Sequence, residues 1–578
     1  MNKEVMVKNK KLALLLEYLL VILIILLVAS CIMFFQLKNK VWINGDDTVF
    51  HDNRFYEILQ QIKTNNSSYF QMNWSFAQTG RIVNAVYGPL FGYFMSFLLL
   101  LSGTWFKFQI LQNYLLFLLG GIGMYYFAKR IKASKLAAIL GMILFLVTGY
   151  MAYWIPGGTF NSWGAALMPY VLIQGVKMIQ SEKEQINWLE LGLTMAVVAQ
   201  VHMLSIIFSI CALIPFFIYG LIISKDKKEL LVNTIKAILL FFVLTSNIWG
   251  SLCFLALTNH LSSTAPFNVG YYALHIGVGT NKDILRVTLY LIIAQLFYVL
   301  WTHSKNKINV FITLEGISFL FLSSQLIPWN LITNHFQFIA TNLQFPNRFT
   351  VIAYPLIFGG IALSLTNFER EWQSKKIIGF LGFLAVLVVI IFSLKGNTQR
   401  IKQKTTEMMQ TSYIVNWSKD KNLNLLLSNL PIYPLEYLPL HGKSTVLEQK
   451  KLIVNNLVAP NKIKKQVLSQ GRLKIMWQAD KKQKTSLLPI VMYHQSKLEV
   501  NGKNKGQIKH YNAIGMPVVK NKVGENEAVL TFVTPHWFTV LLILNLISWV
   551  VIIIFASYQV IRFCLEKPNL LTDKRVKS

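Results

Sequence analysis

The sequence predicts a polytopic α-helical membrane protein of about twelve transmembrane helices, with a small extracellular β-rich domain before the last helix. Of its 578 residues, 54% are apolar and only 14% are charged, whereas soluble domains carry about a quarter charged residues. The apolar residues form blocks of roughly 18 to 26, long enough to cross about 30 Å of hydrocarbon. Lysine and arginine recur between alternate blocks. These three observations exclude a disordered chain and a single soluble core.

The basic clusters set the expected orientation of each helix. By the positive-inside rule, the clusters and both termini face the cytoplasm, and the nearly uncharged loops face outward. The clusters are Lys8, Lys10 and Lys11; Lys129, Arg130, Lys132 and Lys135; Lys225, Lys227 and Lys228; Lys305 and Lys307; Arg370, Lys375 and Lys376; and Lys574, Arg575 and Lys577. The expected crossings are residues 12–36, 108–128, 136–154, 163–180, 187–201, 203–223, 234–257, 284–301, 308–327, 349–367, 377–395 and 536–562.

One apolar segment, residues 87–101, does not fit this count. If it crossed the membrane, every later basic loop and the C-terminal tail would face outward. We therefore expect it to lie in or dip into the outer leaflet, opened by Gly88 and Pro89.

Two stretches are long enough to form structure outside the membrane, and they divide the chain into five parts. These are the cytoplasmic N-terminus and first helix (1–36), a first extracellular loop with juxtamembrane helices (37–107), a multi-helix core (108–395), the extracellular β-rich domain (396–535), and the last helix with a cytoplasmic tail (536–578).

Short apolar runs bounded by turn residues predict the strands of the β-rich domain. Residues 453–458 and 473–477 have this character. Residues 487–493 and 498–500 predict a strand and a hairpin that turns at Asn501-Gly502. Residues 518–519 and 528–533 predict a further pair of strands.

The charge of the β-rich domain indicates a class of partner. Residues 396–535 contain 22 Lys and Arg against 8 Asp and Glu. Such a surplus outside the membrane favours anionic partners such as teichoic acids or lipid head groups. The alternative is the ordinary composition of a lysine-rich proteome.

The first loop carries the residues that predict chemistry. Asp47, His51 and Arg54 follow the first helix at spacings of four and three, which places them on one face of a helix that begins near Asp47. The apolar side of that helix could rest on the membrane, through Val49, Phe50, Tyr56, Leu59 and Ile62. A carboxylate can accept a proton from an attacking hydroxyl, and a guanidinium can stabilise the phosphate of a leaving group. The alternative is a capped amphipathic helix with incidental surface charges.

Two polar residues in other outer loops could reach the same place. Arg348 lies in an otherwise uncharged stretch where Pro346 fixes the approach of the chain, and no acid near it in the sequence neutralises it. It could hold a phosphate, or it could be an interfacial arginine that extends toward water. His202 lies in the short turn between two helices and is either structural or part of the same cavity.

Several kinds of site have no signature in the sequence. The four cysteines lie in or beside apolar blocks without a CxxC pair. No histidine has metal-ligand spacing, so neither a metal nor another cofactor is expected. No P-loop, dinucleotide fingerprint or nucleic-acid module is present.

The pattern Gly-Asp-Asp-x-x-x-His-x-x-Arg directly after the first helix resembles the GT-C superfamily of integral-membrane glycosyltransferases. The match is closest to the bacterial YfhO-type branch, also labelled 6-pyruvoyl-tetrahydropterin synthase-related membrane proteins. Three further segments resemble that branch, and together they cover nearly the whole chain: QFPNRF at 344–349, EYLP at 436–439, and residues 488–493 with the Asn501-Gly502 hairpin.

This resemblance implies sugar transfer at the outer face of a bacterial plasma membrane from a polyprenyl-phosphate-linked donor. It implies that Asp47 is the catalytic base or acceptor-orienting residue, because Asp47 keeps the four-residue step to His51, with Asp46 in reserve. Relatives of the oligosaccharyltransferase type hold a divalent metal with a second acidic motif in a later outer loop. Residues 154–161 contain no carboxylate, so a metal-independent mechanism is expected.

The expected function is therefore transfer of a sugar to an anionic cell-envelope polymer or glycolipid. Asp47 and Asp46 are the predicted catalytic residues, and His51, Arg54, Arg348 and His202 are the predicted donor-binding residues. The alternative is a lipid-linked glycan transporter or export-complex scaffold without catalysis. A transporter would be expected to show internal repeats and broken helices at the midplane.

Overall fold

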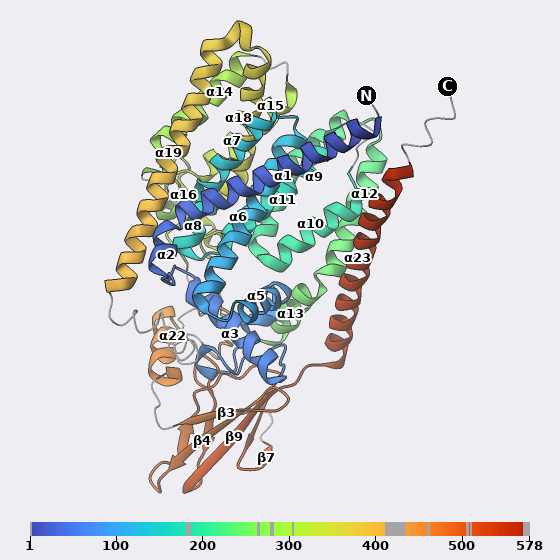
Figure 1. Ribbon diagram of the computed structural model, residues 1–578. Helices are drawn as coiled ribbons and strands as arrows, with labels where there is room; N and C mark the ends of the chain where they lie inside the picture. The colour runs from blue at the N-terminus through green and yellow to red at the C-terminus, as the bar shows by residue number, and fades with distance from the viewer. Residues whose placement is uncertain are drawn as a thin grey trace.

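The computed structural model is a helical bundle with a β domain at one end (Figure 1). The structure describes residues 3–569 except 181–185, 263–265, 278–282, 303–305, 411–434, 443, 459–462, 505–507 and 509–510. Its helices are α1 (Lys3–Ile32), α2 (Phe34–Asn39), α3 (Thr48–Thr64), α4 (Val83–Val86), α5 (Pro89–Ser102), α6 (Trp105–Arg130), α7 (Lys135–Leu146), α8 (Gly149–Gly157), α9 (Asn161–Met178), α10 (Trp188–Val201), α11 (Met203–Ile223), α12 (Lys227–Leu244), α13 (Ser246–Thr258), α14 (Arg286–Trp301), α15 (Lys307–Ser323), α16 (Trp329–His335), α17 (Gln337–Asn342), α18 (Thr350–Arg370), α19 (Trp372–Gln410), α22 (Val446–Leu452) and α23 (His536–Asn569).

The described part of the chain contains six helices that are long and apolar enough to cross a membrane: α1, α6, α11, α18, α19 and α23. Two bent pairs, α7 with α8 and α12 with α13, raise the number to eight if each pair forms one span. The chain is thus a multi-pass membrane protein, and the count of twelve crossings stays a prediction. One predicted boundary is wrong. Helix α19 does not end near residue 395 but continues to Gln410, because no glycine or proline interrupts the polar sequence after Gly396.

Helix α18 is the central element of the bundle. Nearly all of its side chains are buried, and it contacts α15, α7, α19, α9, α14 and α6. By contrast, α1, α19 and α23 expose long rows of leucine, isoleucine and valine. An apolar surface of this size is stable in lipid rather than in water. The same core extends to the site through α6 and α9, whose buried faces pack on each other.

Helix α5 corresponds to the apolar segment that does not fit the topology. Gly88, with a φ of 67°, and Pro89 at the first helical position open it. Its 14 residues span about 21 Å at 1.5 Å per residue, which is shorter than the hydrocarbon core of a bilayer. It packs on α3, α6 and α10 and runs across the bundle beside α3 (Figure 1). Its position in the outer leaflet stays a prediction.

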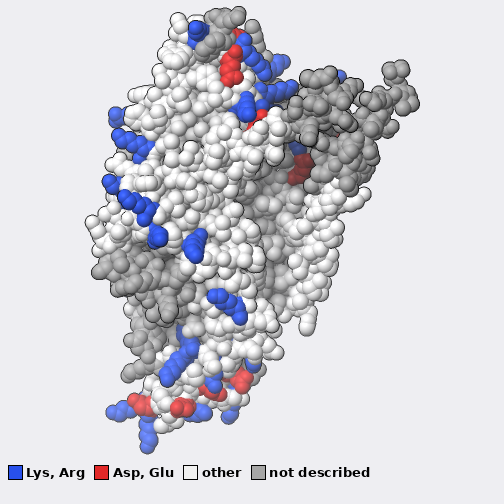
Figure 2. Space-filling view, viewed as in Figure 1, with Lys and Arg blue, Asp and Glu red and all other residues white. Residues whose placement is uncertain are grey.

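The β domain lies at the opposite end of the molecule from the start of α1 and the end of α23 (Figure 1). Figure 2 shows that Lys and Arg gather at these two ends and along the edge that α19 follows, while much of the face between them is uncharged. This distribution is the one expected of a protein that crosses a membrane between its two charged ends.

We expect cysteine labelling to place the two ends on opposite sides of the membrane. Lys482→Cys in the β domain and Lys228→Cys at the start of α12 are both at exposed positions. In a background without the native cysteines, an impermeant maleimide applied to intact cells should label position 482 and not position 228. Labelling at 228 alone would reverse the predicted orientation, and lysed cells, in which both positions react, provide the control.

The β domain contains a five-stranded antiparallel sheet in the order β3-β4-β9-β6-β7 and a two-stranded pair, β5 with β8. The strands are β3 (Lys464–Leu468), β4 (Arg472–Ala479), β5 (Thr485–Leu487), β6 (Ser496–Val500), β7 (Lys503–Asn504), β8 (Val518–Lys520) and β9 (Gly524–Phe532), and a parallel pair, β1 (His275–Gly277) with β2 (Asp283–Leu285), lies among the helices. Alternate side chains of β4 and β6 point into a small apolar core.

The structure confirms some of the predicted strands and corrects others. The hairpin at Asn501-Gly502 is present, and both residues have positive φ, as a two-residue hairpin turn requires. Residues 518–519 do not pair with 528–533, because β4 and β6 occupy both edges of β9. Residues 453–458 form a π-helical turn that continues α22, and 488–493 are irregular rather than a strand.

The first loop contacts the β domain through hydrogen bonds that Lys465 of the domain donates to backbone carbonyls of the loop. Phe76, Ala77 and Gln78 all have φ near 50°, an unfavourable conformation for residues with a Cβ. The buried ammonium of Lys465 on β3 donates to the carbonyls of Ala77 at 2.8 Å and Gln78 at 3.1 Å. It also donates to Pro489 at 2.8 Å. Burial lowers the pKa of Lys465 to about 7. The lysine thus satisfies the carbonyls of a strained turn and holds the loop on the sheet.

Candidate functional site

The predicted helix after α1 is α3, and Asp47 is the residue that precedes it. The backbone N–H of Asp47 donates to Gly157 O at 3.1 Å, and His51 N donates to Asp47 O at 3.1 Å. A Cβ on Gly45 would lie 2.5 Å from the backbone of Gly157, so only glycine allows the two chains to approach this closely. The close contact with the end of α8 therefore fixes the backbone on which Asp46 and Asp47 stand.

The apolar side of α3 does not rest on the membrane surface. Leu59 is buried, and Phe50 packs edge-on against Phe76 and Tyr87. Of the apolar residues predicted to face the membrane, only Ile62 is exposed. Helix α5 and the loop after α3 cover this helix. The position of neither segment can be predicted from the spacing of apolar residues along α3 alone.

His51 and Arg54 lie on the face of α3 that leads from Asp47 into the protein interior. Arg54 is fully buried, its Nη1 is 3.2 Å from His51 Nδ1, and its Nε donates to Asn84 Oδ1 at 3.2 Å. Its guanidinium also donates to the carbonyl of Tyr87 and lies 4.5 Å from the centre of the Tyr87 ring. The ring of His51 stacks on Phe160 with centroids 3.7 Å apart.

These contacts determine the protonation of His51. Burial, with the neighbouring charge of Arg54, lowers the pKa of His51 well below its usual value. The imidazole is therefore neutral at pH 7 and can accept a hydrogen bond from Arg54.

The carboxyl of Asp47 lies in a recess. Its side chain is accessible to solvent, while the protein around it raises its pKa to about 7. Burial is the main cause, the charges of Asp46 and Glu436 add to it, and Arg348 opposes it. Accessibility together with strong desolvation describes a group at the floor of a hollow rather than on an outer surface. A carboxylate with a pKa near 7 is suited to act as a general base near neutral pH.

Arg348 and His202 both lie near this recess. Arg348 is buried at the 3₁₀ turn Pro346–Phe349, and its charge acts on Asp47 and on His202. No acid lies near Arg348 in the sequence, but in the structure the charge of Asp47, which is distant in the sequence, acts on it. His202 ends α10, is hydrogen-bonded to Ser205 at 2.8 Å, and is buried. Burial and the charges of Arg348 and Arg54 lower the pKa of His202 to about 3, so this imidazole is neutral too.

The guanidinium of Arg348 is held by several neighbours, among them the hydroxyl of Tyr150, but one of its donors has no partner in the described part of the chain. Nη1 donates to Leu343 O at 2.7 Å, Nη2 donates to Gln344 Oε1 at 3.2 Å, and the group lies 4.5 Å from the centre of the Phe345 ring. Its buried Nε has no hydrogen-bond partner among the described residues. Buried donors are nearly always satisfied in folded proteins, so an unpaired one beside a carboxylate marks a candidate binding site.

The segment 436–439 contributes residues that sequence reasoning did not assign to the site. The charge of Glu436 acts on both Asp47 and Arg81, and Arg81 Nη2 donates to Glu436 O at 2.8 Å. Burial raises the pKa of Tyr437 to about 12, and the charge of Arg54 opposes this shift. The available signal was the EYLP motif itself, in which Leu438 fills an apolar core while Glu436 and Tyr437 act electrostatically on the site. Tyr87 is a further residue that the sequence did not mark.

The three aspartates of the first loop have different surroundings. Asp46 is exposed and accepts a hydrogen bond from Tyr153 at 2.6 Å. Asp52 is buried and accepts one from Trp42 Nε1 at 3.2 Å, and burial raises its pKa well above the usual value. Asp52 is therefore enclosed by the protein and out of reach of a substrate. Asp47 combines access with a pKa near neutrality.

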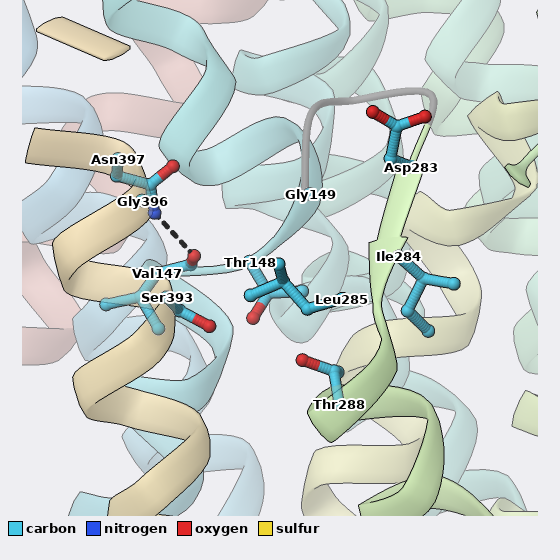
Figure 3. A pocket seen from close by; sticks show the side chains of 10 residues that line it. All are labelled: Val147, Thr148, Gly149, Asp283, Ile284, Leu285, Thr288, Ser393, Gly396 and Asn397. Carbon is cyan, nitrogen blue, oxygen red and sulfur yellow. Dashed lines mark hydrogen bonds between the residues drawn. The ribbon is translucent and has the colours of Figure 1, made fainter. Parts of the chain in front are cut away.

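A small hollow lies between the α7–α8 bend, β2 and α19. It is lined by residues 147–149 of the α7–α8 bend, by β2 and by α19 (Figure 3). Asn397 Nδ2 donates to Val147 O at 2.8 Å across it, and Asp283 projects from β2. Its volume is about 10 Å³, the room of one water molecule, so it cannot hold a sugar.

Among the described residues, no group of three or more His, Cys, Asp or Glu side chains is arranged to hold a metal ion. The predicted metal independence stays a prediction.

The fold and the site together define a multi-pass membrane protein with an acid–base recess between its helices and its β domain. No family model and no curated protein matches the chain. The similar solved structures include the oligosaccharyltransferase of Archaeoglobus fulgidus in the apo form, at 10% identity and a TM-score of 0.39, over 73% of this chain and 61% of that one. They also include ArnT from Cupriavidus metallidurans bound to undecaprenyl phosphate, at 13% identity and a TM-score of 0.43, over 67% of this chain and 77% of that one. The chain thus spans about three-fifths of that oligosaccharyltransferase. Similarity at this level does not by itself establish a shared fold.

Proposed function

We propose that this protein is a GT-C-type glycosyltransferase of the YfhO-type branch that acts at the outer face of a bacterial plasma membrane. It moves a sugar from a polyprenyl-phosphate-linked donor to a cell-envelope polymer or glycolipid. The observation that carries the proposal is the accessible carboxyl of Asp47, with a pKa of about 7, on which the charge of the Arg348 guanidinium acts. A base and a phosphate-binding cation in one recess are what this transfer needs from a protein.

In the proposed mechanism, Asp47 accepts the proton of the acceptor hydroxyl as that oxygen attacks the anomeric carbon. The bond between this carbon and the phosphate oxygen breaks, and the polyprenyl phosphate leaves with the bonding electrons. Arg348 stabilises the charge that develops on the phosphate. Neutral His51 and His202 line the recess without adding charge, and Arg54 keeps His51 in place. Asp46 remains the reserve base, held by Tyr153.

The proposal is tested by the envelope glycans of cells with and without this protein. Mass spectrometry of the polymers and glycolipids should show one glycan that loses a single type of sugar in the deletion strain. Expression of the wild-type chain should restore it. Identical glycan profiles in the two strains, under conditions where the protein is present in the membrane, would contradict the proposed transfer.

The pKa of Asp47 predicts the pH dependence of the transfer. The base must be deprotonated, so the rate should fall about tenfold for each unit of pH below 7 and level off above it. Sugar transfer in detergent-solubilised membranes between pH 5 and 8.5 would show this limb. Binding of the donor, measured separately, should not follow the same curve. A rate that is constant from pH 5 to 7 would remove Asp47 from the role of base.

A further inference from the structure

A groove of about 720 Å³ lies beside the recess, between the segment after residue 265 and helices α16 and α17. Its volume falls within the range of about 300–1,000 Å³ that is typical of small-molecule sites, whereas two smaller cavities are close to 10 Å³. Among the described residues, no charged side chain lines it. Six of its lining residues carry amide or hydroxyl groups: Asn268, Asn330, Thr333, Asn334, Gln337 and Thr341.

The amide groups of this groove are only partly used by the protein. Asn268 Oδ1 accepts from Tyr271 N at 3.2 Å, and Asn330 Oδ1 accepts from Gly270 N at 3.1 Å. These two bonds hold the wall of the groove. Asn334 and Gln337 are exposed, and no hydrogen bond ties their side chains to the rest of the described chain. Each of these amides offers both donors and an acceptor, which are the partners that neighbouring hydroxyl groups of a sugar require.

The groove also has an aromatic wall that leads to Arg348. Phe267 lines the groove, and its ring packs edge-on against Phe345 with centroids 4.9 Å apart. Phe345 in turn lies under the guanidinium of Arg348. A second connection runs through Gln344, which donates to Thr341 O at 2.9 Å and accepts from Arg348. A ligand on Phe267 would therefore be separated by two aromatic rings, Phe267 and Phe345, from the residue proposed to hold the donor phosphate.

We propose that this groove binds an uncharged stretch of carbohydrate in the acceptor, with Asn334 and Gln337 hydrogen-bonding its hydroxyls and Phe267 packing on a sugar ring. The identification of the ligand as an acceptor rests on the proposed transferase function. Binding of a neutral carbohydrate rests on the groove alone. The absence of Lys and Arg from the lining residues separates this groove from the basic surface of the β domain, which suits anionic polymers.

Saturation-transfer NMR with the full chain in nanodiscs tests the binding. The probes are three neutral tetrasaccharides (maltotetraose, cellotetraose and chitotetraose) and one anionic probe, a heparin tetrasaccharide. At least one neutral probe should receive saturation from the wild-type protein, and Asn334→Ala with Gln337→Ala should reduce this transfer at least threefold. Both residues are exposed and unbonded, so folding should survive. If the double variant aggregates, each single variant must show the reduction. Asn342→Ala, an exposed amide on the same segment that does not line the groove, should leave the transfer unchanged.

The groove proposal is overturned if no neutral probe receives saturation, if transfer persists in the double variant, or if heparin transfer depends on Asn334 and Gln337. An Asp47→Asn variant separates this result from the transferase assignment. It should bind the neutral probe like the wild type while losing sugar incorporation. Binding with undiminished incorporation by Asp47→Asn would leave the groove standing and remove the proposed chemistry. If Asp47→Asn loses incorporation but the groove variant keeps a normal KM for the acceptor, the proposed chemistry stands and the groove is not the acceptor site.

Discussion

Asp47→Asn should lower the rate of sugar incorporation by about 10²–10⁴, the usual effect of losing a positioned general base. The amide keeps the size of the carboxyl but cannot accept a proton at pH 7. The side chain is accessible and no hydrogen bond of the described chain depends on its oxygens, so the protein should reach the membrane at normal levels. The measurement is incorporation into the envelope acceptor at matched membrane levels of each variant.

Asp480→Asn, in an exposed turn of the β domain, is the matched control and should retain full activity. The double variant Asp46→Asn with Asp47→Asn tests whether the neighbouring carboxyl substitutes for the lost base. Near-normal incorporation by both the single and the double variant would end the mechanism as assigned. It would favour a transporter or scaffold, because neither needs a base.

Arg348→Lys should reduce kcat/KM for the donor by about 10–100-fold while preserving the positive charge. Charge-assisted hydrogen bonds contribute about 1.5–3 kcal/mol, and each 1.36 kcal/mol corresponds to a factor of ten. Lysine lacks the planar fork that bonds to Leu343, Gln344 and a phosphate at once. The effect should appear mainly as a raised KM for the lipid-linked donor, measured with purified protein in detergent.

Arg472→Lys serves as the control. Arg472 lies on β4, and its Nε donates to Ser469 O at the surface of the β domain. This substitution should leave the KM for the donor unchanged. Thermal stability of both variants, followed by fluorescence-detected gel filtration, separates loss of binding from loss of folding. Equal donor KM for Arg348→Lys and the wild type would show that Arg348 is structural.

The local part of the site could be predicted from the sequence, and the long-range part could not. The spacing of Asp47, His51 and Arg54 defines one helix face, because helical periodicity is a local property, and α3 begins where that spacing requires. The charges of Arg348 and Glu436 act on Asp47 because of how distant segments pack. Nothing in the sequence around these residues carries that information.

The same distinction applies to the fold. The apolar blocks predict membrane-spanning helices, since hydrophobicity over 18 or more residues is a strong signal. The end of α19 was placed too early, because polar residues can continue a helix beyond its apolar part. In the β domain, the Asn501-Gly502 turn was predictable from the turn chemistry of two residues. The partner of β8 was not, because strand pairing depends on which edges of β9 other strands already occupy.

The hydrogen bond from Arg81 to Glu436 joins residues 355 positions apart, and this separation has a consequence for synthesis on the ribosome. At about 5–20 residues per second, Arg81 emerges about 20–70 s before its partner exists. During that interval the nascent chain already contains Asp47, His51 and Arg54, but it lacks residues 436–439, which complete the recess. A message truncated before codon 436 should therefore yield an inactive protein that is prone to degradation, rather than a smaller enzyme with partial activity.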